Sequence, residues 1–369
     1  MSSKSVLSAL GAALIAAACG QAPSAPSVSP SVSPSGALPG LLRSDADVSS
    51  PLEMRALAGR FTNVLTGAAA AGITLTVDGI GAVAGDAAGL FNLETEAPDG
   101  RYRVTASGAG VVARQTTIAF PGAAPVISLI PSTFNVTAFN EIARGATGEA
   151  GVIKRWLNPP ALVVETAFLD RAASFDPASG FPKETSIATD QQLAPGDIDA
   201  LVGHLTAALN RVSGGAMVGF SSVATQTTAP GAVVTRDAMG VMTVARYTSP
   251  QRPCRGYAAF SYFDDYEIAS SYVFLQQCTT QLPGEVSAEL VLAHELGHAL
   301  GYGHVLSSGA SIMTPTITSD VTEFDRQAAA IFFNRRPGNR APDVDPESFV
   351  VNQPARRFGG RTRIAGPVP

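Results

Sequence analysis

The chain has 369 residues, of which 46% are hydrophobic and only 15% are charged. An average globular chain has roughly 25% charged residues, so this composition argues against bulk disorder and against a charge-driven binder. The formal net charge of -5 argues against nucleic acid as a partner, because neutralising phosphates takes a dense basic patch. At roughly 100 to 200 residues per domain, the length allows two domains.

Residues 1–19 have the features of an export signal. Lys4 supplies a positive start, and an apolar run at 6–18 follows it. The run is too short to cross a bilayer as a helix, which takes about 20 residues. The stretch AAACG at 16–20 resembles the lipobox of bacterial lipoproteins, which implies that Cys19 is lipidated and anchors an exported protein to a membrane of the cell envelope. The alternative is an ordinary cleaved signal and a secreted protein, in which Cys19 is incidental.

Two segments of different composition follow the signal. Residues 20–57 are rich in Pro, Ser and Ala and cannot bury enough apolar surface to fold, so we expect a linker. Residues 58–131 alternate apolar and polar positions between turn signals, which predicts a small antiparallel β-sandwich. The pieces GITLTVDG, GDAAGLFNL and PDGRYRVTASG resemble carboxypeptidase-regulatory-like domains of secreted enzymes. A spacer or stabilising role is expected for this domain ahead of carbohydrate or protein binding.

Residues 132–340 predict a second domain with mixed elements. The expected strands are 161–169, 216–220, 240–247, 256–263 and 270–277. One helix is expected from Asp197 and another over 286–300. A last helix begins at Thr322, which has Asp325 at capping-box spacing. The polar, Gly- and Arg-rich residues 341–369 are expected to form a tail.

Two cysteines follow the signal region, Cys254 and Cys278. If 256–263 and 270–277 pair as a hairpin centred near Tyr266, the cysteines fall opposite each other, since both lie twelve residues from it. An exported chain meets an oxidising compartment, which favours a disulfide between them. The alternative is two buried thiols.

The stretch HELGHALGYGH at 294–304 contains three of the four histidines of the chain. On a helix His294 and His298 project from the same face and can share a metal ion. Glu295 stands beside that face, where it can reach a metal-bound water. Gly301 can take a positive φ and end the helix, which lets His304 return as a third nitrogen ligand. Three protein ligands leave one tetrahedral position open, as in catalytic zinc sites. The fourth histidine, His204, has no partner at ligand spacing and is expected to be an ordinary, partly exposed side chain.

The string HExxHxxGxxH resembles the metzincin metallopeptidase signature. The stretch SIMTP at 311–315 is similar to the methionine turn of that family, and its spacing is most like the matrixin branch. The resemblance implies one catalytic Zn²⁺ ion on His294, His298 and His304, with Glu295 as general base and Met313 beneath the imidazoles. The resemblance does not exclude a structural Ca²⁺ ion, although nothing in the sequence indicates one. Val305 and the absence of a tyrosine two residues after Met313 depart from other branches.

The fold class that this resemblance implies is α+β. A metzincin-like catalytic domain with a twisted, mixed, five-stranded sheet and three helices follows the β-sandwich. In that family an antiparallel edge strand binds substrate as an added strand, and residues 257–262 are the candidate here.

The function expected from the motif is that of a zinc metalloendopeptidase acting on proteins or peptides. Two alternatives of other classes remain open. One is an inactive, zinc-containing surface protein that binds a partner through its β-sandwich. The other is a lipid-anchored structural protein in which the metal only stabilises the fold. The sequence leaves cleavage specificity, latency and oligomeric state undetermined.

Overall fold

The computed structural model describes most of the chain after the linker. The described ranges are 54–145, 151–249, 255–278, 286–307, 310–347 and 358–365. All of them belong to one compact unit that begins at Leu52. The signal, Cys19 and Cys254 lie outside the described residues, so lipidation and the disulfide stay predictions.

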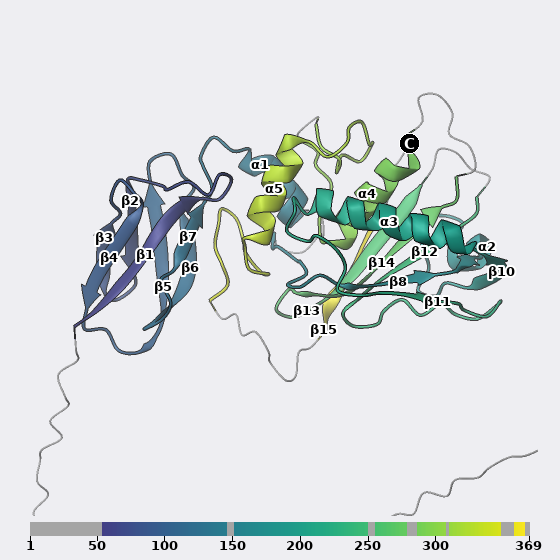
Figure 1. Cartoon of the computed structure of the whole chain (residues 1–369), viewed down its shortest axis with the longest axis horizontal. Coiled ribbons are helices and arrows are strands. Elements are labelled where there is room, and N and C mark those ends of the chain that lie inside the picture. The colour runs from purple at the N-terminus through teal and green to yellow at the C-terminus, as the bar shows by residue number, and fades with distance from the viewer. Residues whose placement is uncertain are drawn as a thin grey trace, which may run out of the picture. The chain divides into compact units, whose positions relative to one another are not determined.

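The first part of the described chain is a β-sandwich (Figure 1). Its seven strands are β1 (Arg55–Asn63), β2 (Ile73–Val77), β3 (Gly81–Ala84), β4 (Leu90–Thr95), β5 (Gly100–Gly108), β6 (Arg114–Phe120) and β7 (Val126–Leu129). One sheet has the order β4-β1-β7 and the other β3-β2-β5-β6. The sandwich was expected to be antiparallel, but β1 and β7 pair in parallel. The alternation in ITLTV buries Ile73, Leu75 and Val77 and exposes the two threonines between them. The alternation therefore decides which face of each strand joins the core.

A mixed sheet forms the centre of the following part. Its strands are β8 (Ala161–Glu165), β9 (Ala167–Leu169), β10 (Ala188–Gln192), β11 (Val223–Gln226), β12 (Val241–Tyr247), β13 (Gly256–Phe263), β14 (Ile268–Gln276) and β15 (Phe358–Ala365). The main path is β10-β9-β12-β14-β13-β15, and β8 pairs with both β11 and β12. The α+β class agrees with the expectation, but the described sheet has eight strands where five were expected.

Four differences account for the larger sheet. One is β10, for which the sequence predicted no strand. The strand expected over 161–169 is two strands, β8 and β9. No strand forms at 216–220, because Ser213 holds the backbone of Met217 in a turn after two positive-φ glycines, and β11 begins only at Val223. The expected polar tail contains β15, which pairs antiparallel with β13.

Three helices of eight or more residues occur among the described residues. They are α3 (Pro195–Val212), α4 (Ala288–Ala299) and α5 (Glu323–Phe333), and shorter turns are α1 (Val136–Asn140), the π-helix η1 (Glu141–Gly145) and α2 (Arg171–Ser174). The predicted capping box of α5 is confirmed, with Thr322 and Asp325 each bonding the other's backbone. Within the described ranges no helix has both the length and the apolar character that crossing a bilayer requires.

Helices α3 and α4 cover one face of the mixed sheet (Figure 1). On that face Phe260 and Tyr262 of β13 join the core that includes Leu205 and Leu296 of the helices. The alternate residues of the sheet face a second core around Phe175 and Phe274. Both faces are thus apolar, and β13 and β14 are buried along almost their whole length.

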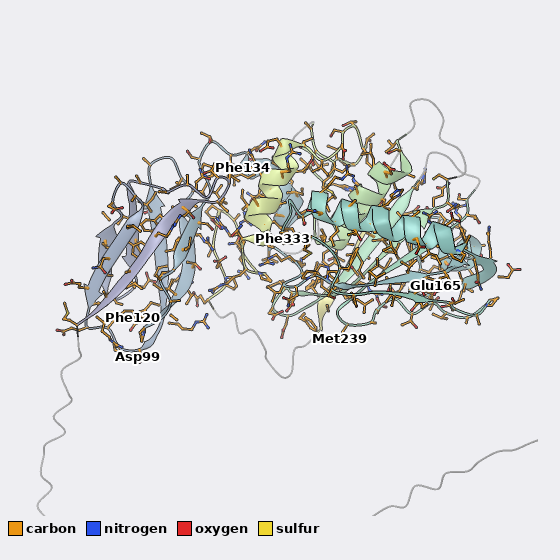
Figure 2. All side chains as sticks on the ribbon, viewed as in Figure 1. Asp99, Phe120, Phe134, Glu165, Met239 and Phe333 are labelled. Carbon is orange, nitrogen blue, oxygen red and sulfur yellow. The ribbon has the colours of Figure 1, made fainter. Side chains whose placement is uncertain are left out.

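The β-sandwich is joined to the following part by packing and by buried polar contacts. Phe134, labelled in Figure 2, lies after the last sandwich strand and stacks on Phe324 of α5 with 5.9 Å between ring centroids. Asp345 pairs with Arg114 of β6 at 3.0 Å, and both side chains are almost fully buried. Residues 343–345, which were assigned to the tail, are therefore part of the core. Their acidic side chains made this stretch look like an exposed tail, but in the structure the carboxylates accept hydrogen bonds from buried partners.

Candidate metal centre and active site

Helix α4 positions the first two histidines. Ser287 caps its N-terminus by accepting a hydrogen bond from the backbone of Leu290. The helix packs against α3, β13 and β14 and is buried from Val291 to Ala299. His294 and His298, one turn apart, both have 0% exposure. Burial on a packed helix fixes the direction of both imidazoles.

Gly301 brings the third histidine to the other two. Its φ is +109°, and a Cβ at this position would lie 2.0 Å from the carbonyl oxygen of Lys154. Only glycine fits this combination of conformation and contact. The helix ends here as the sequence predicted, and the chain turns so that His304 faces the helix. Glycine at position 301 is thus a requirement of the site's geometry.

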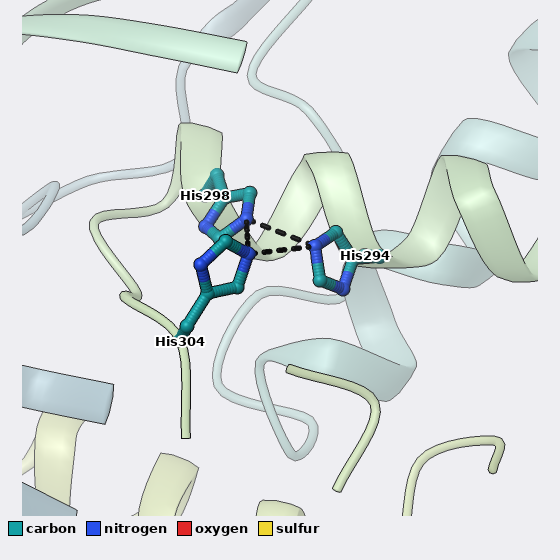
Figure 3. A group of neighbouring side chains, drawn as sticks. All are labelled: His294, His298 and His304. Carbon is teal, nitrogen blue, oxygen red and sulfur yellow. Dashed lines mark hydrogen bonds between the residues drawn. The ribbon is translucent and has the colours of Figure 1, made fainter. Parts of the chain in front are cut away.

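The three imidazoles converge through their Nε2 atoms (Figure 3). The Nε2–Nε2 distances are 3.0 Å for His294–His298, 3.2 Å for His298–His304 and 3.3 Å for His294–His304. Tetrahedral ligands at a Zn–N distance of about 2.0–2.1 Å stand roughly 3.3 Å apart. The spacing therefore fits three ligands of one ion. Among the described residues, these three histidines form a group that could hold a metal ion.

Backbone carbonyls orient two of the rings. Nδ1 of His294 donates to the carbonyl oxygen of Ile312 at 2.7 Å, and Nδ1 of His298 donates to that of Tyr302 at 2.8 Å. A carbonyl only accepts, so the proton sits on Nδ1 and each Nε2 keeps its lone pair for a metal. Burial lowers the pKa of His294 to about 3 and lowers those of His298 and His304 as well. The ligands are therefore neutral at physiological pH, which is the form that binds a metal.

Glu295 is buried beside the triad without a hydrogen-bond partner. Its side chain has 0% exposure, and neither carboxylate oxygen bonds to any described residue. Burial raises its pKa well above the usual value. Gly256 of β13 makes room for it, since a Cβ there would lie 2.3 Å from Cγ of Glu295. A buried, unpaired carboxyl group with a raised pKa is the kind of group that general-base catalysis uses.

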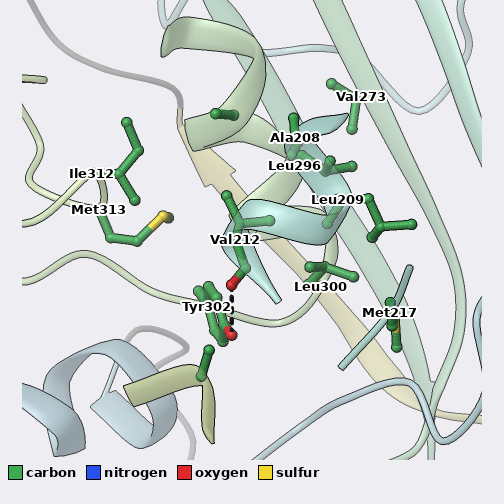
Figure 4. Close-up of a cluster of buried hydrophobic side chains, with 14 of the residues drawn as sticks. Ala208, Leu209, Val212, Met217, Val273, Leu296, Leu300, Tyr302, Ile312 and Met313 are labelled. Carbon is green, nitrogen blue, oxygen red and sulfur yellow. Dashed lines mark hydrogen bonds between the residues drawn. The ribbon is translucent and has the colours of Figure 1, made fainter. Parts of the chain in front are cut away.

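Met313 packs against the helix that carries His294 and His298. Figure 4 draws its side chain next to that of Ile312. It has 0% exposure, and a Cβ on Gly297 would lie 2.5 Å from its sulfur. Its carbonyl accepts a hydrogen bond from the backbone of Val305, the residue after His304. Glycine between the two helical histidines is what allows the thioether to approach. The role of Met313 as an apolar floor beneath the imidazoles stays a prediction.

Sequence reasoning missed the residue that holds the methionine turn. Asp325 accepts hydrogen bonds from the hydroxyl of Ser311 and from the backbone of Ile312 at 3.0 Å, besides capping α5. Ile312 in turn orients His294. The capping-box spacing identified Asp325, but only the fold shows this second contact.

A second missed residue is Glu141 of η1. Its carboxylate accepts hydrogen bonds from the backbones of Leu306 and Ser307, just after His304. No local sequence signal marks it, because the two segments are far apart in the chain.

The remaining candidate residues are not brought to the triad. Cys278 follows β14, partly buried, near the start of α4. His204 is partly exposed, as predicted, with Nε2 at 4.0 Å from a carboxylate oxygen of Glu289.

Residues 217–329 match the matrixin family. The matched range contains the three histidines, Glu295 and Met313, and it covers less than half of the chain. No curated protein matches the chain. The family match and the three-histidine group together suggest a zinc metallopeptidase.

Proposed function

We propose that the chain is a zinc-dependent endopeptidase that hydrolyses peptide bonds. The single observation that carries this proposal is the convergence of three Nε2 atoms beside a buried, unpaired carboxyl group. His294, His298 and His304 would hold the ion, and the donor set and its spacing fit zinc. A zinc ion held there supplies Lewis acidity, which lowers the pKa of a coordinated water and polarises a substrate carbonyl.

Glu295 would move the proton in this reaction. Its carboxylate takes a proton from the attacking water and returns it to the departing amine. Burial raises its pKa, and this makes it a stronger base than an exposed glutamate once it has lost its proton. Met313 and Ile312 would keep the imidazoles in place during turnover.

We also propose that the protein is exported and anchored to the cell envelope through a lipid on Cys19. The support is the sequence of residues 1–19 and the Pro/Ser-rich linker after them. A disulfide between Cys254 and Cys278 would suit such a compartment. Metabolic labelling with a fatty acid, in the wild type and in Cys19→Ser, tests the anchor.

A binding protein is the second candidate, and one surface observation favours it. Leu90 and Val126, on the three-stranded sheet of the sandwich, are more than half exposed and line a shared apolar hollow. Such a patch is typical of an interaction site. A binding protein would not need an ionisable carboxyl group at position 295.

The experiment that separates the two candidates is cleavage of casein and of a peptide library by the wild type and by Glu295→Ala, with metal content measured in both. Hydrolysis only in the wild type, at equal zinc content, supports the peptidase. Zinc in both proteins with hydrolysis in neither favours the binding protein and contradicts the peptidase.

A further inference from the structure

Strand β13 lies between β14 and β15 in the mixed sheet. It pairs with β14 over Gly256–Tyr262 on one side and with β15 over Tyr257–Phe263 on the other. The residue at its start, Gly256, touches the side chain of Glu295, and α4 packs against the strand. A chain that lies along the outer edge of β13 therefore lies on the strand that borders the candidate base.

An open edge of a sheet is a binding site for an extended peptide, because its unpaired backbone groups template another strand. Without β15 the outer edge of β13 would be such a site, with Tyr257–Phe263 available for pairing. In this chain β15 already occupies it in antiparallel register, with Phe260 opposite Thr362 and Tyr262 opposite Gly360.

Two features fit β15 to this edge. Gly360 lies against the ring of Tyr262, where a Cβ would be 2.7 Å from the hydroxyl oxygen, so a larger side chain would push the strands apart. Arg361 pairs with Glu184 at 2.8 Å and also with Asp237, and its Nε donates to the hydroxyl of Ser261. These contacts hold one register of β15.

Beside the backbone pairing with β13, the side-chain ion pairs that fix β15 are polar and partly exposed. Arg361 is 24% exposed, and its partners Glu184 and Asp237 are 69% and 46% exposed. Ion pairs of this exposure are individually weak. The strand that covers the edge is therefore the kind of element that can leave without unfolding the buried core.

We propose that β15 is a built-in occupant of the peptide-binding edge of β13, so that the chain restrains its own activity until β15 is displaced or removed. This inference rests on the proposed peptidase function. The occupant that competes with β15 is an extended peptide segment of a substrate. The alternative to this proposal is that β15 is a permanent strand of the sheet and that substrate binds elsewhere.

Full-length variants test this directly. Arg361→Glu reverses the charge that faces Glu184 and Asp237, and Gly360→Val places a side chain against Tyr262. Arg55→Glu is the matched control, because it breaks an ion pair with Asp99 of similar exposure within the sandwich. The readouts are kcat/KM on an unstructured peptide, zinc content and melting temperature.

We expect kcat/KM to rise at least about threefold in Arg361→Glu and about tenfold in Gly360→Val, at unchanged zinc content, since activity scales with the fraction of open molecules. Arg55→Glu should match the wild type. Adding Glu184→Arg and Asp237→Arg to Arg361→Glu restores the pairs with opposite polarity and should return activity toward the wild-type level. A synthetic peptide of residues 356–369 should inhibit Gly360→Val more strongly than the wild type.

Equal kcat/KM in the wild type and both β15 variants, with no inhibition by the peptide, overturns the restraint and leaves the peptidase standing. Lower activity in both β15 variants also overturns it and makes β15 part of the working sheet. Absence of hydrolysis in every zinc-loaded protein overturns the peptidase, and the proposed restraint fails with it.

Discussion

Ile312 and His294 are joined by a hydrogen bond of 2.7 Å from the imidazole Nδ1 to the backbone carbonyl. Ile312 is also held through its own N–H, which donates to Asp325 at 3.0 Å. A buried carboxylate on α5 therefore fixes a ring on α4 through a single residue of the methionine turn. Groups that orient a metal ligand in this way contribute to affinity although they never touch the metal.

Replacing Asp325 with Asn should weaken zinc binding by about 10–100-fold. The amide can keep only part of the bonds to Ser311, Ile312 and Thr322 that the carboxylate accepts. Zinc affinity is measured by competition with a chromophoric chelator. Asp264→Asn, at an exposed position of the hairpin turn, is the control and should leave the zinc affinity unchanged. Equal zinc affinities in the two variants would show that Asp325 does not support the metal ligands.

Gly256→Ala should lower kcat by about a hundredfold while zinc stays bound. The new Cβ would lie 2.3 Å from Cγ of Glu295 and force the carboxyl group to move, and a shift of about 1 Å at a reacting group costs on that order. Gly203→Ala on α3 is the matched control, because a Cβ there meets no atom within 4 Å. Peptide hydrolysis and metal content are measured together. Full activity in Gly256→Ala would show that Glu295 need not hold this position.

The stability of the zinc-free protein should depend on pH through Glu295 and His294 with opposite signs. Burial lowers the pKa of His294 from 6.5 to about 3, so between these values only the unfolded chain is protonated there and stability falls as pH falls. Burial raises the pKa of Glu295 above 4.5, so above that pH only the unfolded chain loses the proton and stability falls as pH rises.

Glu295→Gln removes the second contribution alone. Urea unfolding of the zinc-free wild type and variant between pH 4.5 and 7.5 should show that the variant gains stability over the wild type as pH rises. A constant difference across this range would mean that Glu295 does not titrate differently in the folded and unfolded states.

Asp343→Ala should destabilise the protein by about 3–5 kcal/mol, because it leaves the charge of Arg335 buried and unpaired. The pair is bidentate at 2.6 and 2.7 Å, and both side chains have 0% exposure. Arg335 also donates to Ser128 of the sandwich, so thermal unfolding should remain a single transition at lower temperature. Asp99→Ala breaks the exposed pair with Arg55 and should cost at most about 1 kcal/mol. A separate, unchanged sandwich transition in Asp343→Ala would contradict this coupling.

The geometry of the three-histidine site could be predicted because its residues are close in sequence. The spacing of His294 and His298 is one helical turn, Gly301 ends the helix, and His304 follows within six residues of His298. Each step depends on local backbone geometry. The capping box that begins α5 was predictable for the same reason.

The contacts that support the site could not be predicted, because they join segments far apart in the chain. Gly256 has no local signal that places it against Glu295, and the second contact of Asp325 exists only once α5 packs against the methionine turn. The C-terminal residues were misread as a tail because β15 is polar and glycine-rich. Its suitability as a strand comes from Tyr262 and from the acidic partners of Arg361, which the segment itself does not contain.

The most direct measurement is X-ray absorption at the zinc edge on the full chain carrying Glu295→Gln, together with the metal-to-protein ratio. One zinc ion per chain with three nitrogen ligands at about 2.0–2.1 Å, reduced to substoichiometric zinc in His304→Ala, is the predicted result. Zinc bound through sulfur, or no stoichiometric zinc in a folded protein, would contradict the assignment of His294, His298 and His304 as a metal centre.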